Sequence, residues 1–405
     1  MEIGPIWRAM LRNKSSYLLI ALQIAFTMAI MVNAIAIIQE RSRMMARPSG
    51  VDEDNIFYLS SIGFAPDFNP RAAIEQDLDA LRSFPGVANA IVTNSVPLQG
   101  GGWSQGLRRE PGEDIESTGV ALYFVDEHGI DTFGVELTAG RNFTPTEVMW
   151  FDPEGGGPHW PDKIILTQAM AEALFPESPH DVVGKTVYIE NDLPITVIGI
   201  MERMQAPWKS WTQLENVMLV PMKRLQTGVR YVIRTEPGYR DEIMPQVEKM
   251  LAESNRGRII RSMMTMTDTR KRSYLADAAM IKLLYFVVSI LTAITGLGIV
   301  GLASFSVARR SKQIGTRRAL GATRAAILRY FMLENFMISG VGVIAGALIA
   351  VAMNIWMVQA FNLTPIAWYV IPLAMLILWL VGQLAVLGPA RRASMVSPAV
   401  ATRAV

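Results

Sequence analysis

The strongest concentration of one charge in this sequence is the segment RRSKQIGTRRALGATR, residues 309–324, with six basic side chains and no acidic one. Guanidinium and ammonium groups in such a cluster bind anionic lipid headgroups or carboxylates on a protein partner. By themselves they break no covalent bond. The segment therefore indicates binding, and its two glycines, Gly315 and Gly321, indicate a defined backbone shape.

No other set of residues has the spacing of a catalytic or metal site. The histidines lack the spacing of zinc ligands: His128, His159 and His180. Neighbouring acid pairs are interpreted as solvated faces or helix starts: Asp126-Glu127 and Asp241-Glu242. The phosphate-binding pattern G-x-x-x-x-G-K-[ST] does not occur. We therefore expect neither an enzyme nor a bound cofactor.

Long stretches without a charged residue flank the basic segment on both sides. Residues 17–38 and 283–308 each suit one membrane span, because a spanning helix needs about 20 apolar residues. Residues 335–390 are long enough for two spans with a turn near Pro365. The first run is too long for the apolar core of a secretory signal, so we interpret it as an anchor. The prediction is four transmembrane helices, at 17–38, 283–307, 336–358 and 366–388.

Charges are distributed unevenly around these spans. All acidic residues except Glu2 and Glu334 lie between Glu40 and Asp277. Basic residues dominate the short segments before residue 15, at 309–329 and after residue 390. Because Lys and Arg enrichment in short loops marks the cytoplasmic side, we predict that both termini and the basic segment are cytoplasmic. The middle region would be outside a bacterial inner membrane.

The middle region reads as an α/β domain. Strand–helix–strand patterns occur near both of its ends, at 55–96 and at 230–265. We expect two small subdomains built from these patterns and a β-rich insert at about 164–220 between them. The chain has no cysteine, so this domain must be stabilised by its core alone.

The predicted spans give clues to mechanism. None contains Asp, Glu, Lys, Arg or His, which argues against an ion-driven secondary transporter. Gly342, Gly346 and Ala350 are spaced four apart and form a small-residue ridge that lets another helix approach closely. That helix could belong to this chain or to a second subunit. The first two helical patterns extend beyond the apolar runs, which predicts two helical stalks that carry the outer domain.

The basic segment itself predicts a short, capped helix. Thr316 is a suitable N-cap and Gly321 a suitable C′ residue, with little more than one turn between them, and Thr323 can cap the following helix. A rigid, solvent-facing helix suits docking into a groove of a cytoplasmic partner. Leu320 would be its apolar anchor with Ile314 packing just before it. The alternative is a basic segment that only fixes topology and binds lipid headgroups.

The sequence also resembles a known family. SVARRSKQIGTRRALGATRAAILRYFMLENFMISGVG, residues 306–342, resembles the core motif of the FtsX-like permeases of ABC transporters. The tail PARRASMVSPAVATR, residues 389–403, resembles the ending of the same family. The outer region is similar to MacB-like periplasmic core domains in LRSFPGVANA, YFVDEHGIDTFGVELTAGRNFTPTE and IILTQAMAEALFPESPHDVVGKTVYI.

The resemblance implies that the basic segment is the coupling helix that contacts a separate ABC ATPase. The residues that would carry this contact are Gln313, Ile314, Gly315, Thr316, Arg317, Arg318, Leu320 and Gly321. Arg317 and Arg318 would meet carboxylates of the ATPase. Where the family usually has a glutamate, this chain has Gln313, which removes one charge.

We therefore expect a permease subunit that couples a partner's ATP hydrolysis to movement of the outer domain, for export of a peptide, drug or lipid-linked substrate. Expected partners are the ATPase, a second copy or a close paralogue, a periplasmic adaptor and membrane lipids, but no nucleic acid. The alternative is a regulator that activates a periplasmic partner such as a cell-wall hydrolase, without transport. The predicted segments are the cytoplasmic N-terminus (1–16), the first span with its stalk (17–47), the outer domain (48–266), the second stalk with its span (267–308), the coupling segment (309–334), the last two spans (335–390) and the cytoplasmic tail (391–405).

Overall fold

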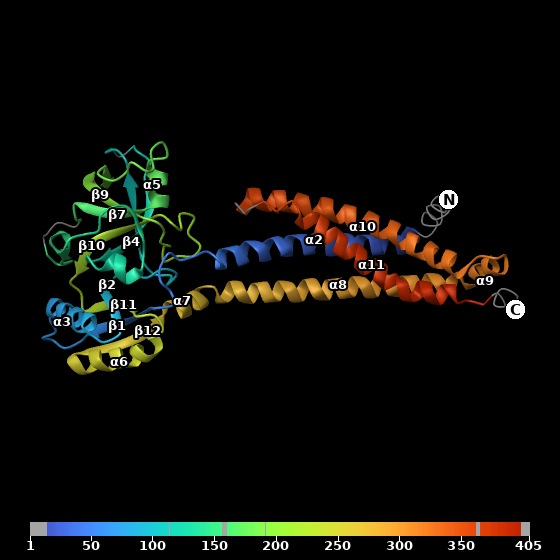
Figure 1. Ribbon diagram of the computed structural model, residues 1–405. Coiled ribbons are helices and arrows are strands. Elements are labelled where there is room, and N and C mark those ends of the chain that lie inside the picture. The colour runs from blue at the N-terminus through green and yellow to red at the C-terminus, as the bar shows by residue number, and fades with distance from the viewer. Residues whose placement is uncertain (1–13, 113, 156–159, 191, 362–364, 398–405) are drawn as a thin grey trace. The chain divides into compact units, whose positions relative to one another are not determined.

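The computed structural model describes residues 14–397 apart from 113, 156–159, 191 and 362–364 (Figure 1). The chain divides into two compact units. One, which we call the outer unit, is formed by Arg47–Leu275. The other is formed by the parts of the chain that precede and follow this range. Each unit is described by itself below.

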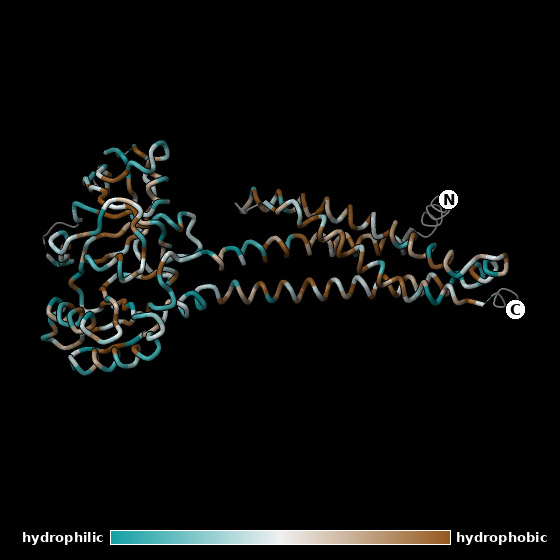
Figure 2. Tube along the Cα trace, in the orientation of Figure 1, coloured by the Kyte–Doolittle hydropathy of each residue, from teal (hydrophilic) through white to brown (hydrophobic). Residues whose placement is uncertain are grey.

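The described residues of the unit formed by both ends of the chain, which we call the helical unit, form helices and the loops that connect them. Its helices are α2 (Lys14–Met45), α8 (Leu275–Arg309), α9 (Ser311–Ala319), α10 (Arg324–Phe361) and α11 (Val370–Ser394). Four of them, all but α9, are long and apolar enough to cross a membrane, which confirms the predicted number of spans. Figure 2 shows apolar residues along most of their length.

Helix α2 is the central helix of this unit. It packs along α10 and α11. Of its most apolar stretch of 18 residues, 56% is buried within the chain, against 11% for the corresponding stretch of α8. Two polar contacts join it to α8: the hydroxyls of Thr27 and Thr295 lie 2.8 Å apart, and the Gln23 side-chain amide donates to the Ile294 carbonyl at 3.1 Å. Hydrogen bonds of this kind hold apolar helices together where packing alone gives little direction.

The residues expected to form one continuous helix from 267 to 308 are divided between two helices. The helical pattern before residue 283 is interrupted, because α7 (Met266–Ser273) belongs to the outer unit and ends at Tyr274, a buried residue with non-helical backbone angles. Helix α8 then begins at Leu275. Just inside it, Asp277 forms an ion pair with Arg41 of α2, so the two helices are joined beyond their charge-free runs.

The outer unit contains a four-stranded antiparallel sheet in the order β12-β1-β11-β2. Its strands are β1 (Ile56–Gly63), β2 (Val87–Thr93), β11 (Gly228–Thr235) and β12 (Arg258–Thr265). Helices α3 (Pro70–Arg82) and α6 (Arg240–Ser254) pack on one face of the sheet, against Phe57 and Leu59 of β1. The expectation of two separate subdomains is therefore wrong, because the two strand–helix–strand patterns interleave their strands in one sheet.

The remaining strands of the outer unit form a mixed sheet of eight strands. They are β3 (Trp103–Arg108), β4 (Thr118–Val125), β5 (Leu137–Gly140), β6 (Met149–Phe151), β7 (Lys163–Thr167), β8 (Thr186–Ile189), β9 (Leu193–Met201) and β10 (Val217–Arg224). Because β4 pairs with both β3 and β10, six of these strands form a closed ring, in the order β4, β3, β8, β9, β7 and β10. The predicted insert at 164–220 is too short, since β3 and β4 complete this ring. Three short helical segments accompany it: α4 (Gly129–Phe133), η1 (Pro145–Glu147) and α5 (Gln168–Leu174).

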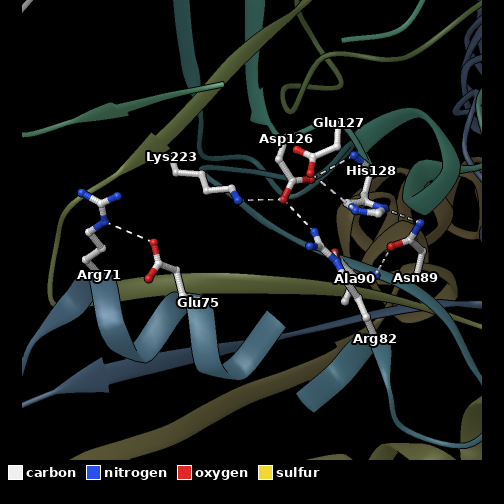
Figure 3. Close-up of polar contacts among 9 residues, drawn as sticks. All are labelled: Arg71, Glu75, Arg82, Asn89, Ala90, Asp126, Glu127, His128 and Lys223. Atoms are coloured by element: carbon white, nitrogen blue, oxygen red, sulfur yellow. Dashed lines mark hydrogen bonds and ion pairs between the residues drawn. The ribbon is translucent and has the colours of Figure 1, made fainter. Parts of the chain in front are cut away.

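A buried carboxylate joins the two sheets (Figure 3). The Asp126 side chain has no exposed surface and accepts from Arg82 of α3 at 2.7 Å and from Lys223 of β10 at 3.2 Å. Its other oxygen accepts from the backbone N–H of His128 at 3.1 Å. The expectation that Asp126 lies on a solvated face is therefore wrong: two cations from distant parts of the chain allow the charge to be buried.

Candidate functional site

The basic segment folds into helix α9, which is longer than expected. Thr316 is not its N-cap; it lies inside the helix, where its hydroxyl donates to the Lys312 carbonyl at 3.0 Å. The N-cap is Arg310, six residues earlier, because the first turns of the helix are packed against the rest of the chain, a tertiary contribution that the local capping pattern does not contain. The expected start of this helix is therefore wrong.

The end of α9 lies where the sequence indicates. Leu320 is the C-cap, and Gly321 has a φ of +96°, a backbone conformation that side chains other than glycine rarely adopt. The Gly321 N–H donates to the Arg318 carbonyl at 3.1 Å, and the Ala322 N–H donates to the Arg317 carbonyl at 3.0 Å. These bonds satisfy carbonyls that a helix end leaves free. The Thr323 hydroxyl then accepts from the Ala326 N–H at 3.1 Å and caps α10, as predicted.

One face of α9 is buried within the chain. Ile314 is 4% exposed and packs against Ile327 and Phe331 of α10 and Ala390 and Ala393 of α11. Gly315 beside it is also buried. The expectation that Ile314 packs against a partner is therefore corrected, because this side chain is covered by the chain's own helices and holds α9 in place.

The other face of α9 is open. Gln313, Thr316 and Arg317 are exposed, and Leu320 is 84% exposed. Arg317 lies 5.2 Å from the ring centroid of Tyr330 and is thereby held beside α10. Arg318 is half-buried. This open face, which we call the docking face, combines cations, a polar amide and one apolar side chain.

A buried polar triad lies beside the first residue of α9. The Tyr17 hydroxyl donates to Glu334 Oε1 at 2.6 Å, and Arg310 donates to the two Glu334 oxygens at 3.0 and 3.2 Å and to the Tyr17 hydroxyl at 2.8 Å. The side chains of Glu334 and Arg310 are 5% and 15% exposed. The triad therefore joins α2, α10 and the junction of α8 with α9. Sequence reasoning missed it, although Glu334 is the only acidic residue after Asp277.

The small-residue ridge of α10 contacts α2 of the same chain. A Cβ on Gly342 would lie 2.8 Å from the Ala21 carbonyl oxygen, and one on Gly346 would lie 2.6 Å from the Ala25 carbonyl oxygen. Ala350, one step further, is fully buried. Only residues without a side chain, or nearly so, allow the two backbones to approach this closely.

Among the described residues, no group of histidine and acidic side chains could hold a metal ion. The arrangement around α9 has instead the features of a docking element. Its buried face, its glycine cap and the triad fix its position within the helical unit, and its docking face is exposed.

Two family models match this chain. Residues 17–250 match the MacB-like periplasmic core domain, and residues 285–398 match the FtsX-like permease C-terminal domain. The macrolide export ATP-binding/permease protein MacB of Neisseria gonorrhoeae is 26% identical over 246 residues, which cover 58% of this chain and 36% of that protein. This chain thus spans about a third of the length of such relatives. The ABC transporter permease YknZ of Bacillus subtilis is 23% identical over 349 residues, 83% of this chain and 81% of that protein.

Two solved structures are similar to part of this chain. The extracellular domain of YknZ gives a TM-score of 0.32 with 18% identity and covers 51% of this chain and all of that one. The periplasmic region of MacB from Actinobacillus actinomycetemcomitans gives a TM-score of 0.35 with 14% identity and covers 57% of this chain and 97% of that one. On the match of its two domains, the chain belongs to the family of ABC transporter permeases in which a MacB-like periplasmic core domain is joined to an FtsX-like permease domain.

Proposed function

We propose that this chain is the permease subunit of an ABC transporter whose ATP is hydrolysed on a separate cytoplasmic ATPase. It would work as a pair of copies, or with a close paralogue, to export a peptide, drug or lipid-linked substrate. The single observation that carries the proposal is the docking face of α9, where Leu320 is 84% exposed among cations while the opposite face of the same helix is anchored.

The contacts around α9 give a route for force. A push on the docking face would reach α10 and α11 through the packing of Ile314, and α2 and α8 through the triad of Arg310, Glu334 and Tyr17. At the other end of α2 and α8, the ion pair of Arg41 with Asp277 would make the two helices move together. Rigid helices joined by buried contacts transmit displacement rather than absorb it.

The test of this function is recovery of an ATPase. A tagged chain, purified from its own host in mild detergent, should bring down a chain with ABC ATPase sequence motifs, and the complex should hydrolyse ATP. A variant ATPase that binds but does not hydrolyse ATP should abolish export-dependent resistance or secretion. Purification without any ABC ATPase would contradict the proposal.

The topology that this function needs makes a separate prediction. Because the chain has no cysteine, single cysteines can be introduced at the exposed residues Ser117 and Ala325. We expect the Ser117→Cys variant to react with a membrane-impermeant maleimide in right-side-out spheroplasts and the Ala325→Cys variant to react only after lysis. Labelling is measured by the mass shift of the purified chain. The reverse pattern would place α9 on the side without ATP and would overturn the proposed function.

A further inference from the structure

The outer unit contains a cavity of about 650 Å³ that the coupling function does not use. It lies against the face of the four-stranded sheet that α3 and α6 leave uncovered: Tyr58 and Ser60 line it, whereas the alternate residues Phe57 and Leu59 pack against those helices. The opposite wall comes from two loops, at residues 98–100 and 207–210.

The cavity collects positive charge. Arg230 of β11 and Arg261 of β12 are both register partners of Ser60, so their side chains flank it on the same face of three adjacent strands. Arg272 of α7 and Lys209 also line the cavity, and no acidic residue in the described part of the chain does. Like charges placed this close repel each other, and an anion between them would remove that repulsion.

Three of these cations are not neutralised by the protein. Arg230, Arg261 and Arg272 form no ion pair with any residue in the described part of the chain, whereas Arg258, on the same strand as Arg261, is paired with the buried Asp77. Arg230 donates to the Asn94 carbonyl at 2.7 Å, but its buried Nε has no hydrogen-bond partner among the described residues. Burial lowers the pKa of its guanidinium, which shows that the charge is held at a cost.

The backbone around the cavity is strained at two positions. Leu98 and Ser262 both line it and have φ values of 65° and 58°, a region that residues other than glycine seldom occupy. Ser262 lies in a register shift between β1 and β12, a bulge that turns this part of β12 toward the cavity. Strain of this kind clusters at binding sites, where it positions side chains at the expense of stability.

Part of the cavity wall is apolar. Trp208, Leu98 and Met264 line it, and Trp208 is held edge-on against Trp211 with ring centroids 5.5 Å apart.

We propose that the cavity binds a phosphate group, with the guanidiniums of Arg230, Arg261 and Arg272 around its oxygens and an apolar substituent against Trp208. Guanidinium groups match the oxygens of a phosphate in pairs, and three of them suit a group with three free oxygens. The inference rests on the outer unit alone and holds whether or not the ATPase proposal is correct.

The test is calorimetric titration of the full-length chain in dodecyl maltoside. Three probes separate the parts of the ligand: inorganic phosphate, n-hexyl phosphate below its micellar concentration, and 1-hexanol, which has the apolar part without the charge. We expect hexyl phosphate to bind about tenfold more tightly than inorganic phosphate, because its chain covers the apolar wall. Hexanol should give no saturable heat.

The variants are chosen to leave the fold unchanged. Arg261→Gln and Arg272→Gln alter exposed residues of the cavity, and Arg256→Gln alters an exposed arginine outside it and is the matched control. Each cavity variant should bind hexyl phosphate about tenfold more weakly, since a charge-assisted hydrogen bond is lost, and the control should bind as the wild type does. Thermal unfolding and gel filtration check that all three are folded.

The outcomes are distinct. Tighter binding of hexyl phosphate supports the site and assigns it to a lipid-like phosphate, and equal binding of the two phosphates supports the site but assigns it to a free phosphate. No binding of either phosphate, or unchanged binding by folded Arg261→Gln and Arg272→Gln chains, would overturn the proposal.

Discussion

The Leu320→Asp variant should recover about a tenth or less of the ATPase that the wild-type chain recovers on co-purification. The Leu320 side chain is 84% exposed and packs against nothing that its loss would disturb, so the fold should be unchanged. Burial of a leucine in a partner's groove stabilises a complex by roughly 1.5–3 kcal/mol, and a carboxylate in the same groove would add a desolvation cost. Leu320→Met, which keeps an apolar side chain of similar size, is the matched control and should bind nearly normally.

Gly321→Val should have a comparable effect by a different route. A Cβ there would meet no atom within 4 Å, so the obstacle is the backbone alone: φ is +96°, and left-handed conformations cost other residues about 1–2 kcal/mol. A β-branched residue is expected to move Leu320 and its neighbours out of position. Gly321→Asn is the control, because asparagine tolerates this conformation at helix ends.

Arg324→Ala, at the first residue of α10, should reduce recovery only mildly because it lies beyond the end of α9. The co-purified ATPase is quantified by immunoblot against the tagged chain, with expression and gel-filtration profiles as checks. Equal recovery from wild type, Leu320→Asp and Gly321→Val would show that the segment serves only to fix topology.

Glu334→Ala should destabilise the helical unit by an amount on the order of 3–5 kcal/mol. Removing this carboxylate leaves Arg310 buried without a counter-charge, which is the costly way to break a buried pair. The apparent melting temperature in detergent, followed by tryptophan fluorescence, should fall by several degrees. ATPase recovery should fall with it, because Arg310 fixes the start of α9.

Two companion variants separate the charge from the packing. In the double variant Arg310→Met with Glu334→Leu both charges are absent, and most of the lost stability should return, since apolar replacement of a buried pair is often nearly neutral. Tyr17→Phe removes two hydrogen bonds, to Glu334 and from Arg310, but leaves the ion pair, and should cost less than Glu334→Ala. If Glu334→Ala melted at the wild-type temperature, the triad would contribute nothing to the position of α9.

The features that could be predicted from the sequence are the local ones. Three charge-free runs, the last of them long enough for two spans, predicted four long helices, because a span needs only about 20 apolar residues in its own stretch of sequence. The end of α9 at Gly321 and the cap at Thr323 were predictable for the same reason, since each depends on one residue and its immediate neighbours.

The features that could not be predicted depend on distant partners. The strand patterns at 55–96 and 230–265 gave no sign of which strand pairs with which, and their interleaving in one sheet follows from long-range pairing. Asp126 could not be placed in the interior without knowing that Arg82 and Lys223 meet it there. The start of α9 depends on the packing of Ile314 against two other helices, which no capping rule contains.

The interleaved sheet has a consequence for how the protein is made. Ile56 of β1 pairs with Arg234 of β11, and Phe57 pairs with Thr265 of β12, so the first strand to leave the ribosome is completed by the last two of the domain. Pairing between strands so far apart in sequence forms slowly. Both edges of β1 therefore stay unpaired while the eight-stranded sheet is synthesised and folds. A chain that stalls during secretion before residue 228 would display these edges, and we expect such fragments to depend on chaperones and to be substrates for quality-control proteases.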